Sequence, residues 1–544
     1  MASTDMPTSP PAGGRGFRIQ APPWWGIEPV PQRLRILGFL DQTALWSSLG
    51  FSLLLIVAGS LLVVLYSFSL TQALIAILIG GVIGNLLLGL AAVVGADLGV
   101  PSMVALRAPL GIRGSYLATA LNVLQNIGWA TFEIVIMALA ADQISQQLLG
   151  FSNAVLWVVV FAVICTFFAV GGPLVLVRQW IEKFAIWLVL ATTVYLTWYL
   201  LSHYDIGALL AIESSSGQFW LGVDLVVALP ISWFPLVSDY SRFSREARSA
   251  FWGTAIGYFL ANVWFFALGV LFVLALGTND VLAAFPTLAA GWLVLLILLV
   301  DETDEGFANI YSTAVSLQNY FPQARQMQLS LLVGIVSALF AGLIITSGVP
   351  LLEYESFLLL IGSFFVPLLG VVAADYFLHQ RRRYDRDALY QSGGRYWFSG
   401  GFNWPAIGAW ALGTVLYWLL TDLPQRTLAP LGLGLPSATT ALPTLSQFGG
   451  TIPSFLLALA LYALIPKSLP SGATRPQLEP PTNQDVPADP YALLGVLRTT
   501  ALEDIEAVYR SKARRLHPDI GGDAEQMKRL NEAIEQIRKE RQAT

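Results

Sequence analysis

The chain has 544 residues, of which 55% are hydrophobic and only 12% are charged, and its mean hydropathy is +0.64. Soluble domains usually carry about 25% charged residues, so this composition indicates a membrane protein. Cys165 is the only cysteine and there are three histidines, which excludes an internal disulfide or cysteine-cluster metal site and makes an enzyme the less favoured class. The net charge of −5 gives no indication of a nucleic-acid partner, and we expect none.

Residues 1–41 lack an apolar core of the signal-peptide type and predict a flexible, Pro- and Gly-rich cytoplasmic arm. Residues 42–466 contain twelve apolar runs of about the length that a helix needs to cross a bilayer. The runs extend from about Gln42 to Tyr66, Gln72 to Ala96, Tyr116 to Asp142, Ala154 to Gly171, Val177 to Leu201, Phe219 to Tyr240, Ala255 to Gly277, Thr287 to Leu317, Leu329 to Gly348, Leu351 to Leu378, Trp404 to Leu420 and Phe448 to Ile465. They predict an all-α polytopic membrane domain with twelve transmembrane helices.

The positive charges give an independent indication of topology. Of the 18 Lys and Arg residues before Lys467, 17 lie in the N-terminal arm or in alternate loops, and only Arg426 lies on the other side. Short cytoplasmic loops retain positive residues, so this asymmetry predicts a multi-pass protein of the cell membrane with both termini in the cytoplasm.

Four segments depart from plain apolar helix. In the third run Trp129 and Glu133 lie four residues apart, hence on one face, with Trp129 at the numerical midpoint of the run. A mid-membrane carboxyl group is costly unless it faces a cavity or a partner, and a structural hydrogen bond to a neighbouring helix is the alternative for Glu133. In the sixth run Pro230 and Pro235 predict a helix broken at mid-membrane, and the small residues from Ser47 to Ser52 make unwinding cheap in the first run. If runs 1–5 and 6–10 form an inverted repeat, the two weak points correspond.

The eighth run carries Asp301-Glu-Thr-Asp-Glu305 in its middle. At helical spacing Asp301, Asp304 or Glu305, Ala308 and Ser312 share a face. Four carboxylates this close cannot all be ionised in a poorly hydrated site, so one is expected to be protonated or to lie beside a cation. The cluster predicts a coupling-ion or proton site, with a solvated cluster in a water-filled vestibule as the alternative.

After the last run the composition changes. Residues 467–488 are rich in proline and predict an extended linker, and residues 489–544 are charged, with apolar residues at helical spacing, which predicts a small soluble helical domain.

Residues 26–465 resemble the nucleobase:cation symporter-1 family of purine, pyrimidine and hydantoin permeases. The resemblance depends on the order and spacing of Gly26-Ile-Glu-Pro-Val-Pro31, Gly99-Val-Pro-Ser-Met-Val, Arg107-Ala-Pro-Leu-Gly-Ile-Arg-Gly-Ser115, Ser232-Trp-Phe-Pro-Leu-Val-Ser-Asp-Tyr-Ser-Arg242, Ala308-Asn-Ile-Tyr-Ser312 and Asp375-Tyr-Phe. It implies a leucine-transporter-type core of ten helices in a 5+5 inverted repeat, two peripheral helices, and a planar heterocycle bound at the midplane.

The resemblance also implies site residues. The heterocycle is expected between Trp129 and Trp233, with its edge at Glu133, where many members carry Gln, and with Asn309, Ser232 and Ser52 as further contacts. A carboxylate at position 133 favours a ligand edge rich in N–H donors, such as that of an aminopyrimidine or a purine. The coupling cation, sodium or a proton, is expected between helix 1 carbonyls near Gly50 and the helix 8 residues Thr303, Asp304 and Asp301. No other cofactor is expected.

The C-terminal segment resembles a J domain. It contains Asp489-Pro-Tyr-Ala-Leu-Leu-Gly-Val496, Tyr509-Arg-Ser-Lys-Ala-Arg-Arg-Leu-His-Pro-Asp519 and Leu530-Asn-Glu-Ala533. The resemblance implies that Arg510, Arg514, His517, Pro518 and Asp519 dock a DnaK-type chaperone; a merely solvated basic face and a domain that has lost its partner are the alternatives.

Two functions therefore compete. The first is cation-coupled uptake of a nucleobase or related heterocycle, such as cytosine, a purine, hydantoin, allantoin or a pyrimidine vitamin precursor, by alternating access. The second is a membrane-anchored co-chaperone or sensor whose helical body is only the anchor. Intramembrane carboxylates and broken helices favour the first, because an anchor in the lipid bilayer needs neither.

Overall fold

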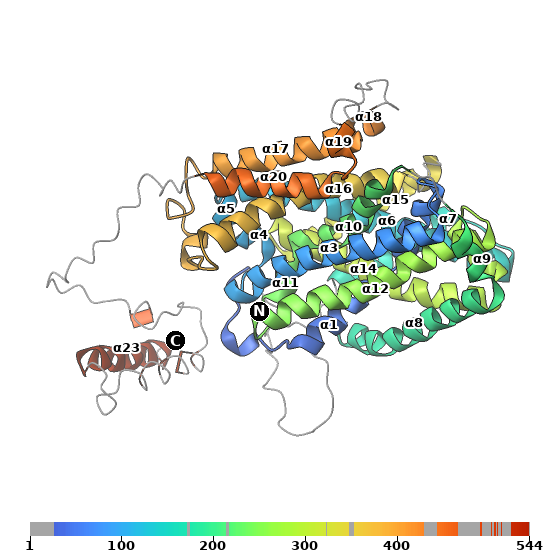
Figure 1. The fold of residues 1–544 in the computed structure, drawn as a ribbon. Coiled ribbons are helices and arrows are strands. Elements are labelled where there is room, and N and C mark those ends of the chain that lie inside the picture. The colour runs from blue at the N-terminus through green and yellow to red at the C-terminus, as the bar shows by residue number, and fades with distance from the viewer. Residues whose placement is uncertain are drawn as a thin grey trace. The chain divides into compact units, whose positions relative to one another are not determined.

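The computed structural model describes residues 27–170, 175–213, 217–321, 324–347, 353–428, 443–465 and 524–542, and a few isolated positions between 490 and 513. The chain divides into two compact units, Met1–Ala473 and Thr474–Thr544. The helices of the first unit are coloured from blue to orange in Figure 1.

The described residues of the first unit are helical, apart from turns and two isolated β-bridges. In chain order the helices are η1 (Gln32–Leu34), α1 (Phe39–Ser48), α2 (Leu53–Val64), α3 (Leu70–Leu98), α4 (Ser102–Ala105), α5 (Arg107–Leu110), α6 (Ser115–Leu149), α7 (Ala154–Val170), α8 (Val175–His203), α9 (Ile206–Ala211), α10 (Phe219–Ser232), α11 (Phe234–Ser241), α12 (Ala247–Leu276), α13 (Val281–Ala284), η3 (Phe285–Thr287), α14 (Gly291–Leu317), α15 (Gln326–Ser347), α16 (Glu353–Ala373), η4 (Ala374–His379), η5 (Asp387–Tyr390), α17 (Trp404–Thr421), α18 (Leu423–Leu428), α19 (Pro443–Ser446) and α20 (Thr451–Leu464).

Each of the twelve expected runs is occupied by a helix or a pair of helices. Within the described residues six helices are long and apolar enough to cross a membrane, or seven if the bent pair α1 and α2 forms one span. The six are α3, α6, α10 with α11, α12, α15, and α16 with η4. The chain is therefore a membrane protein, while the count of twelve spans stays a prediction.

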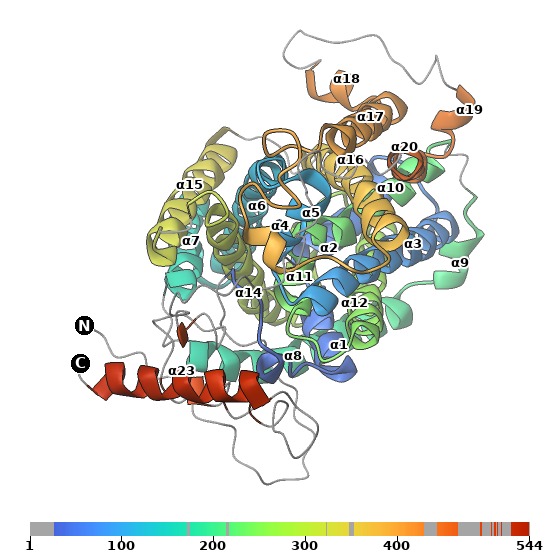
Figure 2. The same cartoon turned by 90° about the vertical axis from the view of Figure 1, so that its left-hand side faces the viewer.

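The long helices form two packed groups around the broken first helix. In one group α12 contacts α1, α2 and α3, and α3 contacts α10 and α11; in the other, α14 and α6 pack together and against α7 and α15. Figure 2 shows α2 and α11 near the centre, α7 and α15 on one side, and α16, α17 and α20 on another. Gly59 lets α2 approach α12 closely, because a Cβ there would collide with the backbone of Phe266.

The two predicted helix breaks differ in kind. α1 ends at Ser48, α2 begins at Leu53, and the two axes differ by 66°, so the break in the first helix is confirmed. The break in the sixth helix is milder than predicted. Trp233, between α10 and α11, keeps right-handed helical angles (φ −80°, ψ −13°), so the axis continues although proline removes ladder hydrogen bonds. The freed carbonyl oxygen of Ser232 accepts a hydrogen bond from Gln125 Nε2 at 3.0 Å.

Part of the expected N-terminal arm is bound to the helices. Val30 N–H donates to Gly99 O, after α3, and Leu37 N–H donates to Phe243 O, after α11. The Arg35 guanidinium donates to Ala96 O at 2.9 Å, and burial lowers the pKa of Arg35. Residues 27–37 are therefore packed structure rather than flexible chain.

A polar cluster lies beside this segment. Arg382 makes two 2.9 Å hydrogen bonds to the carboxylate of Asp97, which raise the pKa of Arg382, and Tyr376 donates to the same carboxylate at 2.7 Å. Arg107 is buried, contacts Leu389 O and Asn319 Oδ1, and has its pKa lowered by burial. Guanidinium groups remain charged at neutral pH in both environments.

The second unit is built around α23 (Ala524–Gln542). Leu530, Ile534 and Ile537 recur at helical spacing and are buried with Tyr491 and Ile505. Arg538 pairs with Glu506 at 2.9 Å, and Tyr509 donates to Asn531 Oδ1 at 2.8 Å. These contacts form a small core of the kind that the helical spacing predicts.

Candidate functional site

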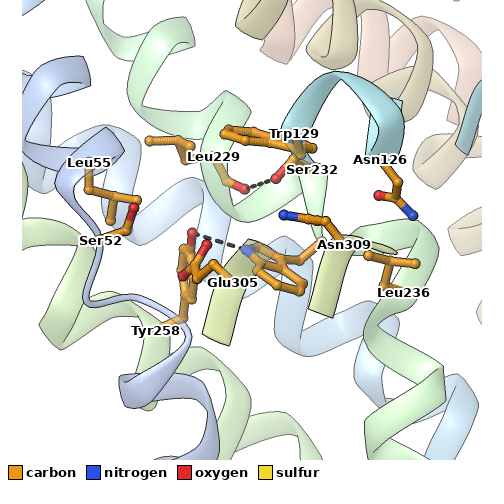
Figure 3. Close-up of a pocket in the computed structure, with 11 residues that line it drawn as sticks. Ser52, Leu55, Asn126, Trp129, Leu229, Ser232, Leu236, Tyr258, Glu305 and Asn309 are labelled. Carbon is orange, nitrogen blue, oxygen red and sulfur yellow. Dashed lines mark hydrogen bonds between the residues drawn. The ribbon is translucent and has the colours of Figure 1, made fainter. Parts of the chain in front are cut away.

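A buried pocket lies where the break between α1 and α2 meets α6, α10, α11, α12 and α14. Figure 3 shows its residues, which converge on one space from these elements. They are Ser52, Leu55, Asn126, Trp129, Leu229, Ser232, Trp233, Leu236, Tyr258, Glu305 and Asn309. Five of the six residues predicted to contact substrate are therefore brought together; Glu133 is the exception.

Two tryptophans line the pocket from different helices. Trp129 of α6 is 7% exposed and packs edge-on against Tyr354 and Phe357 of α16, with ring centroids at 5.9 and 5.3 Å. Trp233, between α10 and α11, packs edge-on against Trp46 and donates its indole N–H to the hydroxyl of Tyr258 at 3.1 Å. Both rings are fixed by neighbours before any ligand binds, which suits the stacking of a planar ring.

Amide and hydroxyl groups supply the polar part of the pocket. Asn126 and Asn309 are buried at 0% and 4% exposure and both line it. Neither the oxygen nor the nitrogen of the Asn126 amide makes a hydrogen bond to another protein group. Ser232 instead donates to Leu229 O at 2.6 Å, so its hydroxyl oxygen is left to accept. Asn126 thus offers one donor and one acceptor side by side to a ligand.

The pocket is nearly closed. Its cavity measures about 10 Å³, which is about the space that one water molecule needs. A heterocycle therefore requires the surrounding side chains or helices to move apart before it can enter.

Glu133 lies one helical turn beyond Trp129 and is fully buried. Neither of its oxygens accepts a hydrogen bond from an N–H or O–H donor of the protein. Glu133 is not among the residues that line the pocket, so its predicted contact with the substrate stays a prediction.

Glu302 connects α14 to the break in the first helix. Its Oε1 accepts the hydroxyl hydrogen of Ser52 at 2.8 Å, and its Oε2 accepts the backbone N–H of Leu53, the first residue of α2, at 2.8 Å. This carboxylate therefore caps the N-terminus of α2, where the helix dipole favours a negative charge.

The inward face of α14 is turned by one residue position from the predicted face. Glu302, Glu305, Asn309, Ser312 and Ser316 are buried along it, whereas Asp301 is partly exposed. Successive residues of a helix point about 100° apart, so a face centred on Glu302 and Glu305 turns Asp301 toward its edge. The stripe through Asp301 and Ala308 and the stripe through Glu302 and Asn309 both have helical spacing. The sequence prediction chose the first of the two.

The residues predicted to hold a cation lie as follows. Gly50 is in the break, and the place that a Cβ would take there is filled by Ala261 and Tyr258 of α12. The hydroxyl of Thr303 donates to Val300 O of its own helix at 2.7 Å, and its carbonyl oxygen lies 3.8 Å from the Cys165 sulfur. Asp304 lies in α14, and its side chain is outside the described residues. Among the α14 side chains that the structure describes, Glu302 makes the hydrogen bonds to the break, and the cation set stays a prediction.

The sequence analysis missed Asn126 and Tyr258, which line the pocket. It included Glu302 and Glu305 in the predicted carboxylate cluster but did not single them out, although Glu305 lines the pocket and Glu302 is bonded to the break. A signal for Glu302 and Glu305 was present, since Glu302, Asn309 and Ser316 recur every seven residues, whereas Asp301 is followed by Ala308 and Val315.

The residues predicted to dock a chaperone, Arg510, Arg514, His517, Pro518 and Asp519, lie outside the described residues. Their role stays a prediction from the sequence.

Residues 29–434 match the family model described as permease for cytosine/purines, uracil, thiamine and allantoin, and residues 489–543 match that of the DnaJ domain. The hydantoin permease of Microbacterium maritypicum is 27% identical over 448 residues, covering 76% of this chain and 88% of that protein. The cytosine permease of Escherichia coli K12 is 26% identical over 355 residues, covering 63% of this chain and 78% of that protein.

Among solved structures, the inward-facing conformation of Mhp1 superposes with a TM-score of 0.66 at 22% identity, covering 82% of this chain and 94% of that one. At this identity the likeness concerns the fold. It confirms the predicted leucine-transporter-type helical architecture.

Proposed function

The chain belongs to the family of permeases for cytosine, purines, uracil, thiamine and allantoin, and we propose that it imports a nucleobase or related heterocycle together with a cation by alternating access. Membership makes it a transporter rather than an enzyme. The observation that carries the proposal is the pocket bounded by Trp129 and Trp233 at the break of the first helix. Broken helices and buried polar groups at mid-bundle are the features that transporters of this architecture use for binding.

The pocket favours a planar ring with a lactam edge. Trp129 and Trp233 offer two aromatic surfaces, and a carboxamide such as that of Asn126 matches a ligand edge that presents N–H and C=O side by side. Hydantoin, uracil, cytosine, allantoin and the oxopurines all carry such an edge. We propose that Asn126, Asn309, Ser232 and Ser52 bind it, with the ring between the tryptophans.

The coupling cation of the proposed symport is sodium or a proton. Buried carboxyl groups of α6 and α14 lie next to the pocket and suit either cation. The distribution of positive residues supports insertion in the cell membrane with both termini in the cytoplasm.

The direct test measures binding and transport together. Purified full-length protein is reconstituted in liposomes loaded with an unlabelled heterocycle, and counterflow of radiolabelled hydantoin, cytosine, uracil and allantoin is recorded. We expect counterflow of at least one of them, reduced at least tenfold in Trp129→Ala. The matched control is Trp404→Ala, because Trp404 is 58% exposed and far in sequence from the pocket residues. Equal loss in both variants, or unchanged counterflow in Trp129→Ala, would refute the assignment of the pocket.

A second function belongs to the C-terminal unit. Its match to the DnaJ domain and the small core around α23 support recruitment of a DnaK-type chaperone. In that case the full-length protein in detergent stimulates the ATPase of a DnaK-type chaperone, and His517→Gln abolishes the stimulation. Stimulation that persists in His517→Gln would contradict the docking role predicted for His517, Pro518 and Asp519.

A further inference from the structure

Tyr258 of α12 lines the substrate pocket with a ring that its neighbours hold in place. The residue is 1% exposed and packs edge-on against Trp46 and Trp233, with ring centroids at 6.2 and 6.4 Å. Its Cδ2 atom lies 3.4 Å from the place that a Cβ would take on Gly50, in the break of the first helix. The hydroxyl group at the tip of this ring is therefore positioned before a ligand binds.

The hydroxyl hydrogen of Tyr258 is not used within the described part of the chain. An indole N–H can only donate, so in the 3.1 Å hydrogen bond between Trp233 and Tyr258 the phenol oxygen is the acceptor (Figure 3). Among the residues that the structure describes, none accepts a hydrogen bond from the Tyr258 hydroxyl, and this includes Glu305, which lines the same pocket. A buried hydroxyl hydrogen without an acceptor costs free energy, and an acceptor atom of a ligand recovers that cost.

The two serine hydroxyl groups of the pocket already use their hydrogens. Ser52 donates to a carboxylate oxygen of Glu302 at 2.8 Å. Ser232 donates to Leu229 O at 2.6 Å. Both serines can therefore only accept from a ligand. Of the three hydroxyl groups among the eleven lining residues, that of Tyr258 is the one that can donate to a ligand without first breaking a bond to the protein.

We propose that Tyr258 binds substrate by donating a hydrogen bond from its hydroxyl group to a carbonyl oxygen of the heterocycle. The inference rests on the proposed function and names a further residue that recognises the substrate. The bond that the phenol oxygen accepts from Trp233 strengthens this donor, because hydrogen bonds in a chain polarise one another. Trp233 thus acts twice, with its ring face against the heterocycle and with its N–H on the residue that binds the carbonyl.

The three hydroxyl groups together define the kind of ligand that the pocket selects. Tyr258 requires an acceptor, whereas Ser52 and Ser232 require N–H donors. A ring that carries both C=O and N–H groups satisfies all three, and a ring whose carbonyl oxygen is replaced by a weak acceptor leaves the Tyr258 hydrogen unpaired. The pocket should therefore favour oxo-heterocycles over their sulfur analogues, since sulfur accepts hydrogen bonds weakly.

The test compares each oxo ligand with its sulfur analogues. Purified full-length protein is titrated with hydantoin, cytosine, uracil and allantoin, and with the analogues of each in which one carbonyl oxygen is replaced by sulfur. Affinities come from competition with the radiolabelled heterocycle that gives counterflow, and thermal unfolding without ligand identifies the variants that fold. The proteins are the wild type, Tyr258→Phe and Thr197→Val.

Thr197→Val is the matched control. The Thr197 hydroxyl accepts the indole N–H of Trp264, also on α12, at 2.8 Å, and Thr197 is not among the residues that line the pocket. Both substitutions keep the shape of the side chain and leave an indole N–H without its acceptor. Only Tyr258→Phe also removes a group that faces the ligand.

We expect the wild type to bind the oxo ligand about tenfold more tightly than the analogue with sulfur at one of the carbonyl positions. Tyr258→Phe should bind the oxo ligand about tenfold more weakly than the wild type does and bind that analogue with unchanged affinity, so that the preference disappears. Thr197→Val should keep the preference of the wild type.

Three results would overturn the inference and leave the proposed transport intact. A wild type that binds every oxo ligand and its sulfur analogues equally well has no such donor, and this measurement needs no variant to fold. A preference that persists in Tyr258→Phe assigns the carbonyl contact to another residue. An equal loss of affinity for both kinds of ligand in Tyr258→Phe shows that Tyr258 only supports Trp233. Absence of counterflow for every heterocycle in the wild type refutes the proposed function, and this inference falls with it.

Discussion

Replacing Asn126 by leucine should stabilise the empty protein and weaken ligand binding. The Asn126 amide is fully buried and makes no hydrogen bond to another protein group. A buried polar group left unpaired costs about 1–3 kcal/mol, and leucine has a similar volume without that cost. We therefore expect Asn126→Leu to raise the free energy of unfolding of the ligand-free protein by about 1–3 kcal/mol.

The same change removes the donor and acceptor that we assign to the substrate edge. Loss of a neutral hydrogen bond in a closed site weakens binding by about tenfold, or 1.4 kcal/mol. Stability and affinity should thus move in opposite directions, which a merely structural role of Asn126 would not produce.

Asn122, one turn earlier on α6, provides the matched control. Its amide nitrogen donates to the Ser316 hydroxyl at 2.7 Å, and its oxygen accepts from Gln125 at 2.9 Å, so Asn122→Leu should destabilise the protein. Thermal unfolding in detergent, with and without a saturating heterocycle, measures both quantities. The reasoning is refuted if Asn126→Leu lowers the stability of the empty protein or leaves the ligand-induced shift unchanged.

Three further changes test contacts elsewhere in the helical unit. Gly59→Ala should destabilise the protein by about 2 kcal/mol, because its Cβ would collide with the α12 backbone; an unchanged melting temperature would contradict the close approach. Asp224→Ala should cost about 2 kcal/mol and speed amide exchange at the start of α20, because its buried carboxylate accepts the N–H groups of Gly450 and Thr451; slow exchange at both amides would argue against this cap. Arg382→Ala should change stability by less than about 1 kcal/mol, because its pair with Asp97 is partly exposed, and a larger loss in thermal unfolding would show that the pair does more.

Some features of the fold were accessible from the sequence for clear physical reasons. The run from Ser47 to Ser52 contains three serines and a glycine, residues that hold a helix weakly, and the chain breaks there. The two prolines of the sixth helix were a weaker guide. They remove hydrogen bonds, but they do not require a bend when Trp233 keeps helical angles.

The site was predictable in its residues more than in their orientation. Trp129, Trp233, Ser232, Asn309 and Ser52 were identified and do meet. Glu133 shares the helical face of Trp129 in the sequence but does not line the pocket, because helical spacing gives a face and does not give the orientation of a side chain. On α14 two stripes overlap, one beginning at Asp301 and one at Glu302. The helices that pack against α14 determine which stripe faces inward, and in the sequence only the seven-residue recurrence of polar residues distinguishes the two.

The short segment before α1 sets which parts of the bundle can move as one. Its backbone is bonded to the end of α3 at Gly99 and to the end of α11 at Phe243, and these two helices come from opposite halves of the repeat. A segment that is hydrogen-bonded to both ends fixes their separation, so α3 and α11 should move as a single rigid body. Spin labels placed at these two ends should therefore keep one distance whether or not a heterocycle is bound, while the distance from either end to α15 changes.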